Sequence, residues 1–182
     1  MAAAALRAQL NAHIAGMYTS GVVDEDTFEE LRDEGTAAEV SRLFIYDASE
    51  IIDDIDLLME EPVVDFDEVE ALTQQLMRCT SSVGAQQVNL ACMHFGNFYA
   101  IQYKQGCLVS LALVRNEFYI VRHELEIMMQ LEEEIAACGP DSYVAASGGG
   151  RTWPHAIPCI MWSMCLRRCS GFQRVSSTRG CA

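Results

Sequence analysis

Apolar residues recur every three or four positions through the first 138 residues of this chain, and a single proline, Pro62, interrupts them. This period matches the 3.6 residues of a helical turn and predicts amphipathic α-helices. The longest run covers residues 107–138, with apolar positions at Leu108, Leu111, Phe118, Val121, Leu125, Met128 and Ile135. No strand-like alternation and no internal repeat accompany it. The sequence therefore predicts an all-α protein.

Helix start and stop signals divide the pattern into segments. Thr36 and Glu39 have the spacing of a capping box, and Asp65 stands as an N-cap three residues before Glu68. Gly84 is a stop signal, as is the Gly-Pro pair at 139–140. The predicted helices are 3–19, 26–33, one from the capping box to Pro62, one from Asp65 to Gly84, 85–102 and 107–138. Short connections imply antiparallel neighbours, so we expect an up-down four-helix bundle with an N-terminal helical cap.

Charge and composition change near residue 139. Residues 1–138 carry 7 basic and 25 acidic side chains, whereas residues 139–182 carry five arginines and one aspartate. Both tryptophans, Trp153 and Trp162, lie in the second part, which has no heptad and no clean alternation. We therefore expect a bundle domain over residues 1–138 and a disordered or loosely packed, irregular tail over residues 139–182.

The totals exclude several classes of function. A net charge of −14 argues against nucleic-acid binding, which needs cations to neutralise phosphates. No run approaches the ~20 apolar residues that cross a bilayer, and no export signal is visible, so the eight cysteines are expected to be thiols in a reducing compartment. The acidic runs lack the spacing of a calcium loop. Cys165 and Cys169 leave structural zinc open as a minor alternative, but we expect no metal and no cofactor.

Residues 68–83 define the most informative surface. On a helical wheel, the stripe Val69, Leu72, Leu76, Cys79 and Val83 faces the core. Gln74 lies about 200° from Leu72 and points outward. Arg78 sits one turn above Gln74, an exposed Met77 flanks both, and Ser81 completes the face. The face contains no nucleophile. It is either a solvated surface or a partner-binding surface made of Gln74, Met77, Arg78 and Ser81.

Several segments resemble the plant histidine-containing phosphotransfer proteins. They are "MAAAALRAQLNA", "EEPVVDFDEVEAL", "SSVGAQQV" and "GCLVSLALVRNEFYIVRHELEIMMQLEEEI". The resemblance covers residues 1 to about 138 and implies a helical bundle that works between cytokinin-sensing histidine kinases and response regulators. The family motif His-Gln-Leu-Lys-Gly-Ser-Ser precedes the Val-Gly-Ala that matches residues 83–85. It places the phosphoacceptor histidine at Gln74, the lysine at Met77 and the glycine at Arg78, with Cys79 and Thr80 in place of the serines.

These departures identify the chain as a pseudo-member of that family. An imidazole nitrogen is nucleophilic at neutral pH, whereas the nitrogen lone pair of a carboxamide is delocalised. The resemblance implies a monomeric, non-catalytic attenuator in the cytoplasm and nucleus that binds receiver domains of sensor kinases and response regulators. Two alternatives stay open. One is an active relay through another histidine, for which His94, expected to be partly buried, is the least unsuitable and His123 is expected to be solvated. The other is a helical scaffold with no signalling role.

Overall fold

The computed structural model describes residues 2–138, and these residues form six α-helices with no strand among them. The helices are α1 (Ala2–Thr19), α2 (Glu25–Asp33), α3 (Ala37–Glu60), α4 (Phe66–Ser82), α5 (Gln86–Tyr99) and α6 (Lys104–Ala137). The expected all-α class and bundle are confirmed. The expectations for residues 139–182, including the tail, Trp153, Trp162 and the zinc alternative, lie outside the described residues.

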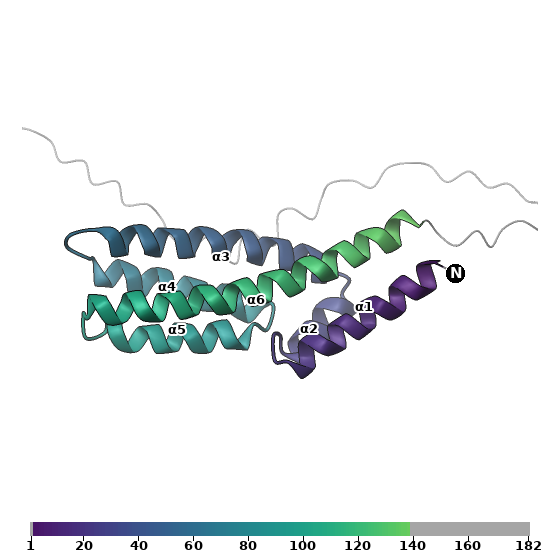
Figure 1. Cartoon of the computed structure of the whole chain (residues 1–182), viewed down its shortest axis with the longest axis horizontal. Coiled ribbons are helices and arrows are strands. Elements are labelled where there is room, and N and C mark those ends of the chain that lie inside the picture. The colour runs from purple at the N-terminus through teal and green to yellow at the C-terminus, as the bar shows by residue number, and fades with distance from the viewer. Residues whose placement is uncertain (1, 139–182) are drawn as a thin grey trace, which may run out of the picture. The chain divides into compact units, whose positions relative to one another are not determined.

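Four of the helices, α3 to α6, form the bundle. Each packs on the next along the chain, and α6 closes the ring by packing on α3. Figure 1 shows these four running side by side, with α1 and α2 at one end next to the C-terminal part of α6. Two ion pairs join α3 to α6, Asp56 with Arg115 and Glu133 with Arg42. The cap that the sequence predicts is therefore formed by α1 and α2, with α1 lying on α6 and α2 on α3.

The core follows the predicted apolar stripes, with one exception. Phe44 of α3 and Phe118 of α6 meet edge to face, with ring centroids 5.9 Å apart. Ile55, Leu76 and Leu125 are fully buried in the same core cluster. Leu108, which the pattern placed inward, is 40% exposed. It lies in the first turns of α6, which begins at Lys104 rather than at 107, and there the helix is not covered on that side.

The start of α3 lies where the sequence predicts it, with Thr36 as the N-cap, but the hydrogen bonds made there differ from the prediction. Thr36 makes no capping hydrogen bond within α3. Its backbone N–H donates to the carbonyl of Leu31 (2.9 Å), and its hydroxyl donates to the same oxygen (3.3 Å). Gly35, with φ of +72°, donates to the Arg32 carbonyl. This pair of bonds is the Schellman motif, so Thr36 closes the end of α2. The capping-box prediction at Thr36–Glu39 was wrong because the hydroxyl serves the preceding helix.

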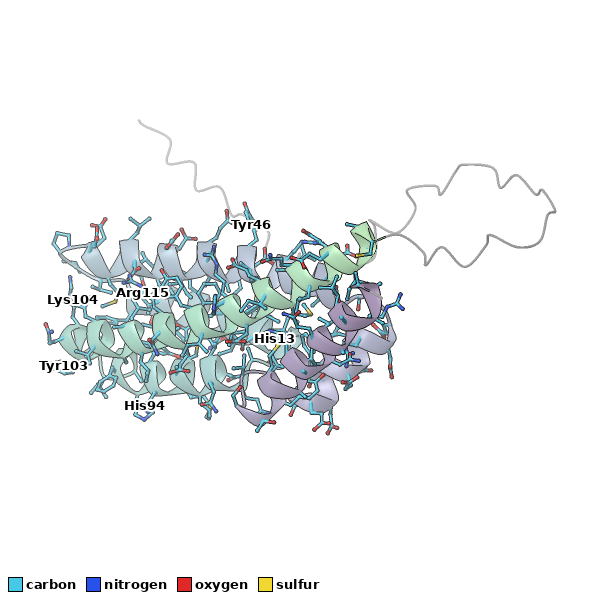
Figure 2. The ribbon with its side chains drawn as sticks, turned by 45° about the vertical axis from the view of Figure 1, so that its right-hand side comes forward. His13, Tyr46, His94, Tyr103, Lys104 and Arg115 are labelled. Atoms are coloured by element: carbon cyan, nitrogen blue, oxygen red, sulfur yellow. The ribbon has the colours of Figure 1, made fainter. Side chains whose placement is uncertain are left out.

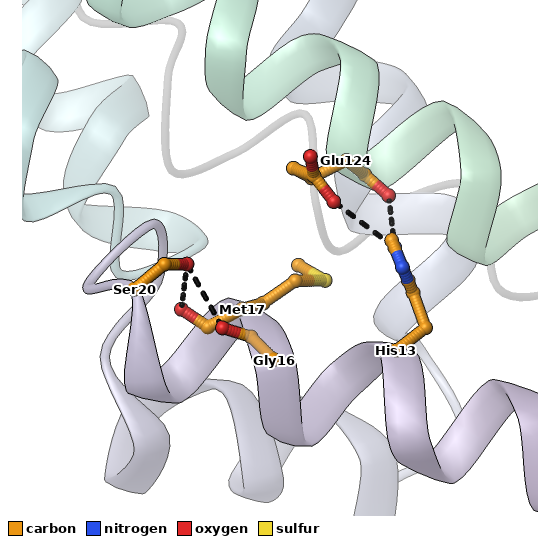
Figure 3. Close-up of polar contacts among 5 residues, drawn as sticks. All are labelled: His13, Gly16, Met17, Ser20 and Glu124. Carbon is orange, nitrogen blue, oxygen red and sulfur yellow. Dashed lines mark hydrogen bonds and ion pairs between the residues drawn. The ribbon is translucent and has the colours of Figure 1, made fainter.

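The first helix is held on the bundle by a contact between distant parts of the chain. His13 Nε2 lies 2.9 Å from the backbone oxygen of Glu124 in α6 and 3.5 Å from its carboxylate (Figure 3). Ile14 and Met17, on the same helix, are buried. At the end of α1, the Ser20 hydroxyl donates to the carbonyls of Gly16 and Met17 (Figure 3). Apolar burial and one cross-helix polar contact together fix α1 against α6.

Candidate functional site

Helix α4, which carries the predicted site, is fixed at both of its ends. At its start, Asp65 Oδ1 accepts hydrogen bonds from the backbone N–H groups of Asp67 and Glu68, both at 3.2 Å. The N-cap predicted at Asp65 is therefore confirmed. At its end, Gly84 adopts a φ of +69° and the Ala85 N–H donates to the Thr80 carbonyl. These caps fix where α4 begins and ends, and the burial of its apolar side decides which side chains reach solvent.

The inward stripe of α4 follows the wheel prediction and is wider than expected. Val69, Leu76 and Val83 are fully buried, while Leu72 and Cys79 are partly buried. Thr73 and Thr80 are also fully buried. Their hydroxyls donate to backbone carbonyls of their own helix, Thr73 to Val69 (2.7 Å) and Thr80 to Met77 (2.8 Å). These two threonines belong to the core side, which the apolar pattern alone did not reveal.

The outward face carries the other predicted residues, with one correction. Gln74, Arg78 and Ser81 are exposed and recur at four- and three-residue spacing along one side of α4. Met77 is only partly exposed and packs against the core. Its backbone carbonyl accepts from Ser81 Oγ at 2.8 Å. The prediction of an exposed methionine was wrong because its flexible side chain folds back onto apolar neighbours.

Opposite charges flank Gln74 on this face. Gln74 Nε2 donates to Glu70 Oε1, one turn earlier, at 3.1 Å. Arg78, one turn later, takes part in none of the ion pairs among residues 2–138. Residues four apart on a helix are neighbours, so the carboxamide lies between a carboxylate and an available guanidinium. The four-residue spacing of Glu70 and Gln74 could have revealed this contact from the sequence.

Helix α5 adds a polar neighbour to the face. Asn89 Nδ2 donates to Ser81 Oγ at 3.5 Å, which places Asn89 of α5 next to the outward face of α4. His94, five residues beyond Asn89, is exposed and points away from the bundle (Figure 2). The expectation of a partly buried His94 was wrong. His123 is exposed, as expected for a solvated position.

Two other reactive side chains, the Cys92 thiol and the Tyr18 phenol, are buried or hydrogen-bonded. Burial raises the pKa of the Cys92 thiol to about 12, so this residue is not a thiolate nucleophile at neutral pH. Burial, followed by the hydrogen bond to Glu29, raises the pKa of Tyr18 to about 12. Arg32 binds the same carboxylate at 2.6 Å. The Tyr18–Glu29–Arg32 network holds α1 on α2. Among residues 2–138, no group of three or more His, Cys, Asp or Glu side chains is placed to hold a metal ion.

The geometry defines an antiparallel helical bundle that presents the polar side chains Gln74, Arg78 and Ser81 on the outward face of α4. No protein-family model matches the chain. Histidine-containing phosphotransfer protein 2 of rice (Oryza sativa subsp. japonica) is 46% identical over 146 residues, or 77% of this chain and 98% of that protein. A crystal structure of a histidine-containing phosphotransfer protein from rice is 44% identical with a TM-score of 0.72, and the match covers 75% of this chain and 99% of that one.

The chain therefore belongs to the plant histidine-containing phosphotransfer protein family. The family that the motifs indicated is confirmed, and so is its fold. Similarity extends to a protein named as a pseudo-member, pseudo histidine-containing phosphotransfer protein 6 of Arabidopsis thaliana. It is 29% identical, over 74% of this chain and 92% of that protein. None of the helices described between residues 2 and 138 is long and apolar enough to cross a membrane.

Proposed function

We propose that this family member binds receiver domains of sensor histidine kinases and response regulators through the outward face of α4, and that it does not carry a phosphoryl group at position 74. One observation carries the proposal. The motif places the phosphoacceptor at Gln74, and this side chain is exposed in the middle of α4, where a partner can reach it. The position is thus accessible but holds a carboxamide.

The chemistry of the face supports binding without transfer. A carboxamide donates and accepts hydrogen bonds, but its nitrogen lone pair is delocalised and does not attack phosphorus. Met77 supplies no positive charge beside the acceptor position. Arg78 supplies one a residue later, but its side chain adds bulk where the family motif has glycine. We therefore propose that the protein competes for receivers and attenuates the phosphorelay, acting as a monomer in the cytoplasm and nucleus.

A second candidate function is an active relay that uses His94. Two observations favour it. His94 is exposed on α5, the helix whose Asn89 contacts Ser81 of the α4 face. In addition, the rice relative at 46% identity carries the name of a phosphotransfer protein, while the pseudo-member is 29% identical. In this second function the phosphoryl group would form a bond to an imidazole nitrogen of His94 and leave the aspartate of a receiver.

The two candidates differ in one measurement, the transfer of labelled phosphate from a phosphorylated receiver domain to the purified protein. The first expects no label on the unmodified chain and saturable receiver binding in a parallel titration. The second expects acid-labile label that His94→Gln abolishes and His123→Gln, at the other exposed helical histidine, leaves unchanged. Absence of both label and receiver binding would leave only the scaffold alternative.

A graded set of substitutions then tests the assignment of α4. Gln74→His alone should restore transfer poorly, because Met77 supplies no charge and Arg78 crowds the approach. Gln74→His with Met77→Lys and Arg78→Gly should exceed it by about tenfold or more, since a charge-assisted contact contributes about 1.5–3 kcal/mol. Arg78→Gly alone should tighten receiver binding if clearance limits docking. Equal transfer by the single and triple variants would show that Met77 and Arg78 are incidental.

A further inference from the structure

One end of the bundle, opposite the α1–α2 cap, is built from two connections that a single side chain ties together. These are residues 61–65, between α3 and α4, and residues 100–103, between α5 and α6. Lys104 Nζ, at the start of α6, donates to the backbone carbonyl of Glu61 at 2.7 Å. Both connections lie at the same end of the ring of helices in Figure 1, and Figure 2 shows Tyr103 and Lys104 there. We call this end the bundle tip.

The bundle tip exposes large apolar side chains from both connections. Val63 is 88% exposed, Ile101 is 69% exposed and Tyr103 is 51% exposed. The Tyr103 ring packs at a tilt against Phe98, with centroids 6.4 Å apart, and about half of its surface stays exposed. Single exposed apolar residues are ordinary, but a group of them on one surface marks a site of interaction.

The helix end that presents Ile101 and Tyr103 has an unusual residue at its left-handed position. After α5, the N–H of Gln102 donates to Tyr99 and the N–H of Tyr103 donates to Phe98, which is the same pair of bonds that closes α2 and α4. At those two ends the left-handed residue is a glycine. Here it is Gln102, with φ of +53°, which is unfavourable for a residue with a Cβ. Residues held in unfavourable backbone conformations are concentrated at functional sites.

Charge decides which kind of partner fits. Four exposed acidic residues lie in or beside the α3–α4 connection that carries Val63, namely Glu60, Glu61, Asp65 and Asp67. Two cations lie near this end of the bundle, and both are engaged. The Lys104 ammonium is bound to the Glu61 carbonyl, and Arg115 is paired with Asp56. Such a surface repels a second copy of itself and an anionic lipid surface. It complements a segment with positive charges beside apolar side chains.

We propose that the bundle tip binds a short basic segment of a partner protein, with apolar side chains of that segment packed on Val63, Ile101 and Tyr103. The acidic rim orients the segment through its arginine or lysine side chains. This surface lies at the end of the bundle, whereas the receiver-binding face proposed above lies along the middle of α4. Either of the two proposed sites can therefore be refuted without affecting the other.

The test uses the full chain and a blocked synthetic peptide in which leucines alternate with arginines. Binding should saturate, weaken as salt is added because exposed charges are screened, and fall at least tenfold when glutamates replace the arginines. Val63→Ser and Ile101→Ser should each weaken it by about fivefold, as expected for losing most of one apolar contact. Leu43→Ser, at an exposed apolar residue in the opposite half of α3 (47% exposed), should leave it unchanged.

Lys104 gives an independent readout, because it is the only lysine in the chain. The bound peptide should slow acetylation of Lys104 at least threefold, with the α-amino group of Met1 as the internal reference. Receiver binding in the same preparations should not change with Val63→Ser. The proposal is overturned if the Val63 and Ile101 substitutions leave the affinity for the arginine peptide unchanged. It is also overturned if the glutamate peptide binds equally well, or if no saturable binding is seen. It is also overturned if Ile101 mediates self-association in sedimentation.

Discussion

Gly84 occupies the point where the N-terminal cap meets the connection between α4 and α5. Its carbonyl accepts from the Asp24 N–H at 2.9 Å, and Asp24 Oδ1 accepts from Gln86 Nε2 at 2.8 Å. A Cβ added to Gly84 would lie 3.0 Å from the Asp24 Cβ and 3.1 Å from its nitrogen. The residue therefore needs both a left-handed φ of +69° and a close backbone approach.

Gly84→Ala should lower the free energy of unfolding by roughly 1–3 kcal/mol, because the alanine would be strained in this conformation and would press on Asp24. Gly16→Ala is the matched control. Gly16 lies within α1 with nothing within 4 Å of an added Cβ, so alanine there should raise the free energy by about 0.5–1 kcal/mol. Urea denaturation of the two variants measures both effects, and a loss of equal size at the two positions would refute the close-approach explanation.

At the level of single residues, the sequence predicted the direction in which a side chain points better than its degree of exposure. Periodicity placed Gln74 and Arg78 outward and Val69 and Leu76 inward because helical geometry alone sets those directions. It missed the burial of Thr80, whose hydroxyl is satisfied by its own helix. It also misjudged residues near the edge of a stripe, such as His94, where exposure depends on how far the neighbouring helices extend.

At the scale of the helices, the capping of each terminus depends on which of two neighbouring helices a polar side chain hydrogen-bonds. Asp65 has no helix immediately before it, so its carboxylate is available to cap α4. Thr36 follows α2 by three residues and is used there instead. The two motifs are similar as sequence and differ in their surroundings. For this reason the capping hydrogen bonds of α4 could be predicted from residue types, whereas at Thr36 only the position of the helix start could be.

The end of α5 offers a test of the left-handed position. Gln102→Gly should stabilise the protein by a few tenths to about 1 kcal/mol, because glycine removes the Cβ conflict that costs about 1–2 kcal/mol while losing more backbone freedom on folding. Thermal unfolding followed by circular dichroism measures it. Gln75→Gly, at an exposed position in the middle of α4, is the control and should destabilise by about 1 kcal/mol. A destabilising Gln102→Gly would show that the Gln102 side chain makes a favourable contact.

The attachment of α1 to α6 depends in part on His13. His13→Ala removes the donor that binds the Glu124 carbonyl at 2.9 Å, and we expect a loss of about 0.5–1.5 kcal/mol. The loss should fall mainly on α1. Amide hydrogen exchange should speed up in residues 2–19 and stay unchanged in α4 and α5. Arg7→Ala, at an exposed position of the same helix, should change neither region. Uniformly faster exchange across α3 to α6 would show that α1 and the bundle unfold as one unit.

For the whole molecule, the bundle itself could be predicted and the placement of its cap could not. Long amphipathic helices joined by short connections leave antiparallel packing as the simplest way to bury their apolar sides. The contact of α1 with α6 joins positions 111 residues apart at His13 and Glu124, and no local pattern encodes such a pairing. The same limit applies to the bundle tip, where Lys104 meets Glu61 across 43 residues.

A final prediction concerns how much of the chain the bundle needs. We propose that residues 1–138 form an independent domain, because α6 ends at Ala137 and the Cys138 N–H closes it on the Glu134 carbonyl at 3.1 Å. Removing residues 141–182 should keep the mean helical signal of the remaining residues and shift Tm by no more than about 2 °C. Cutting the chain after Glu124 is the control. It removes the buried Leu125, Met128 and Leu131, each worth about 2–5 kcal/mol, and should abolish cooperative unfolding. A large drop in Tm on removing 141–182 alone would show that the domain extends beyond residue 140.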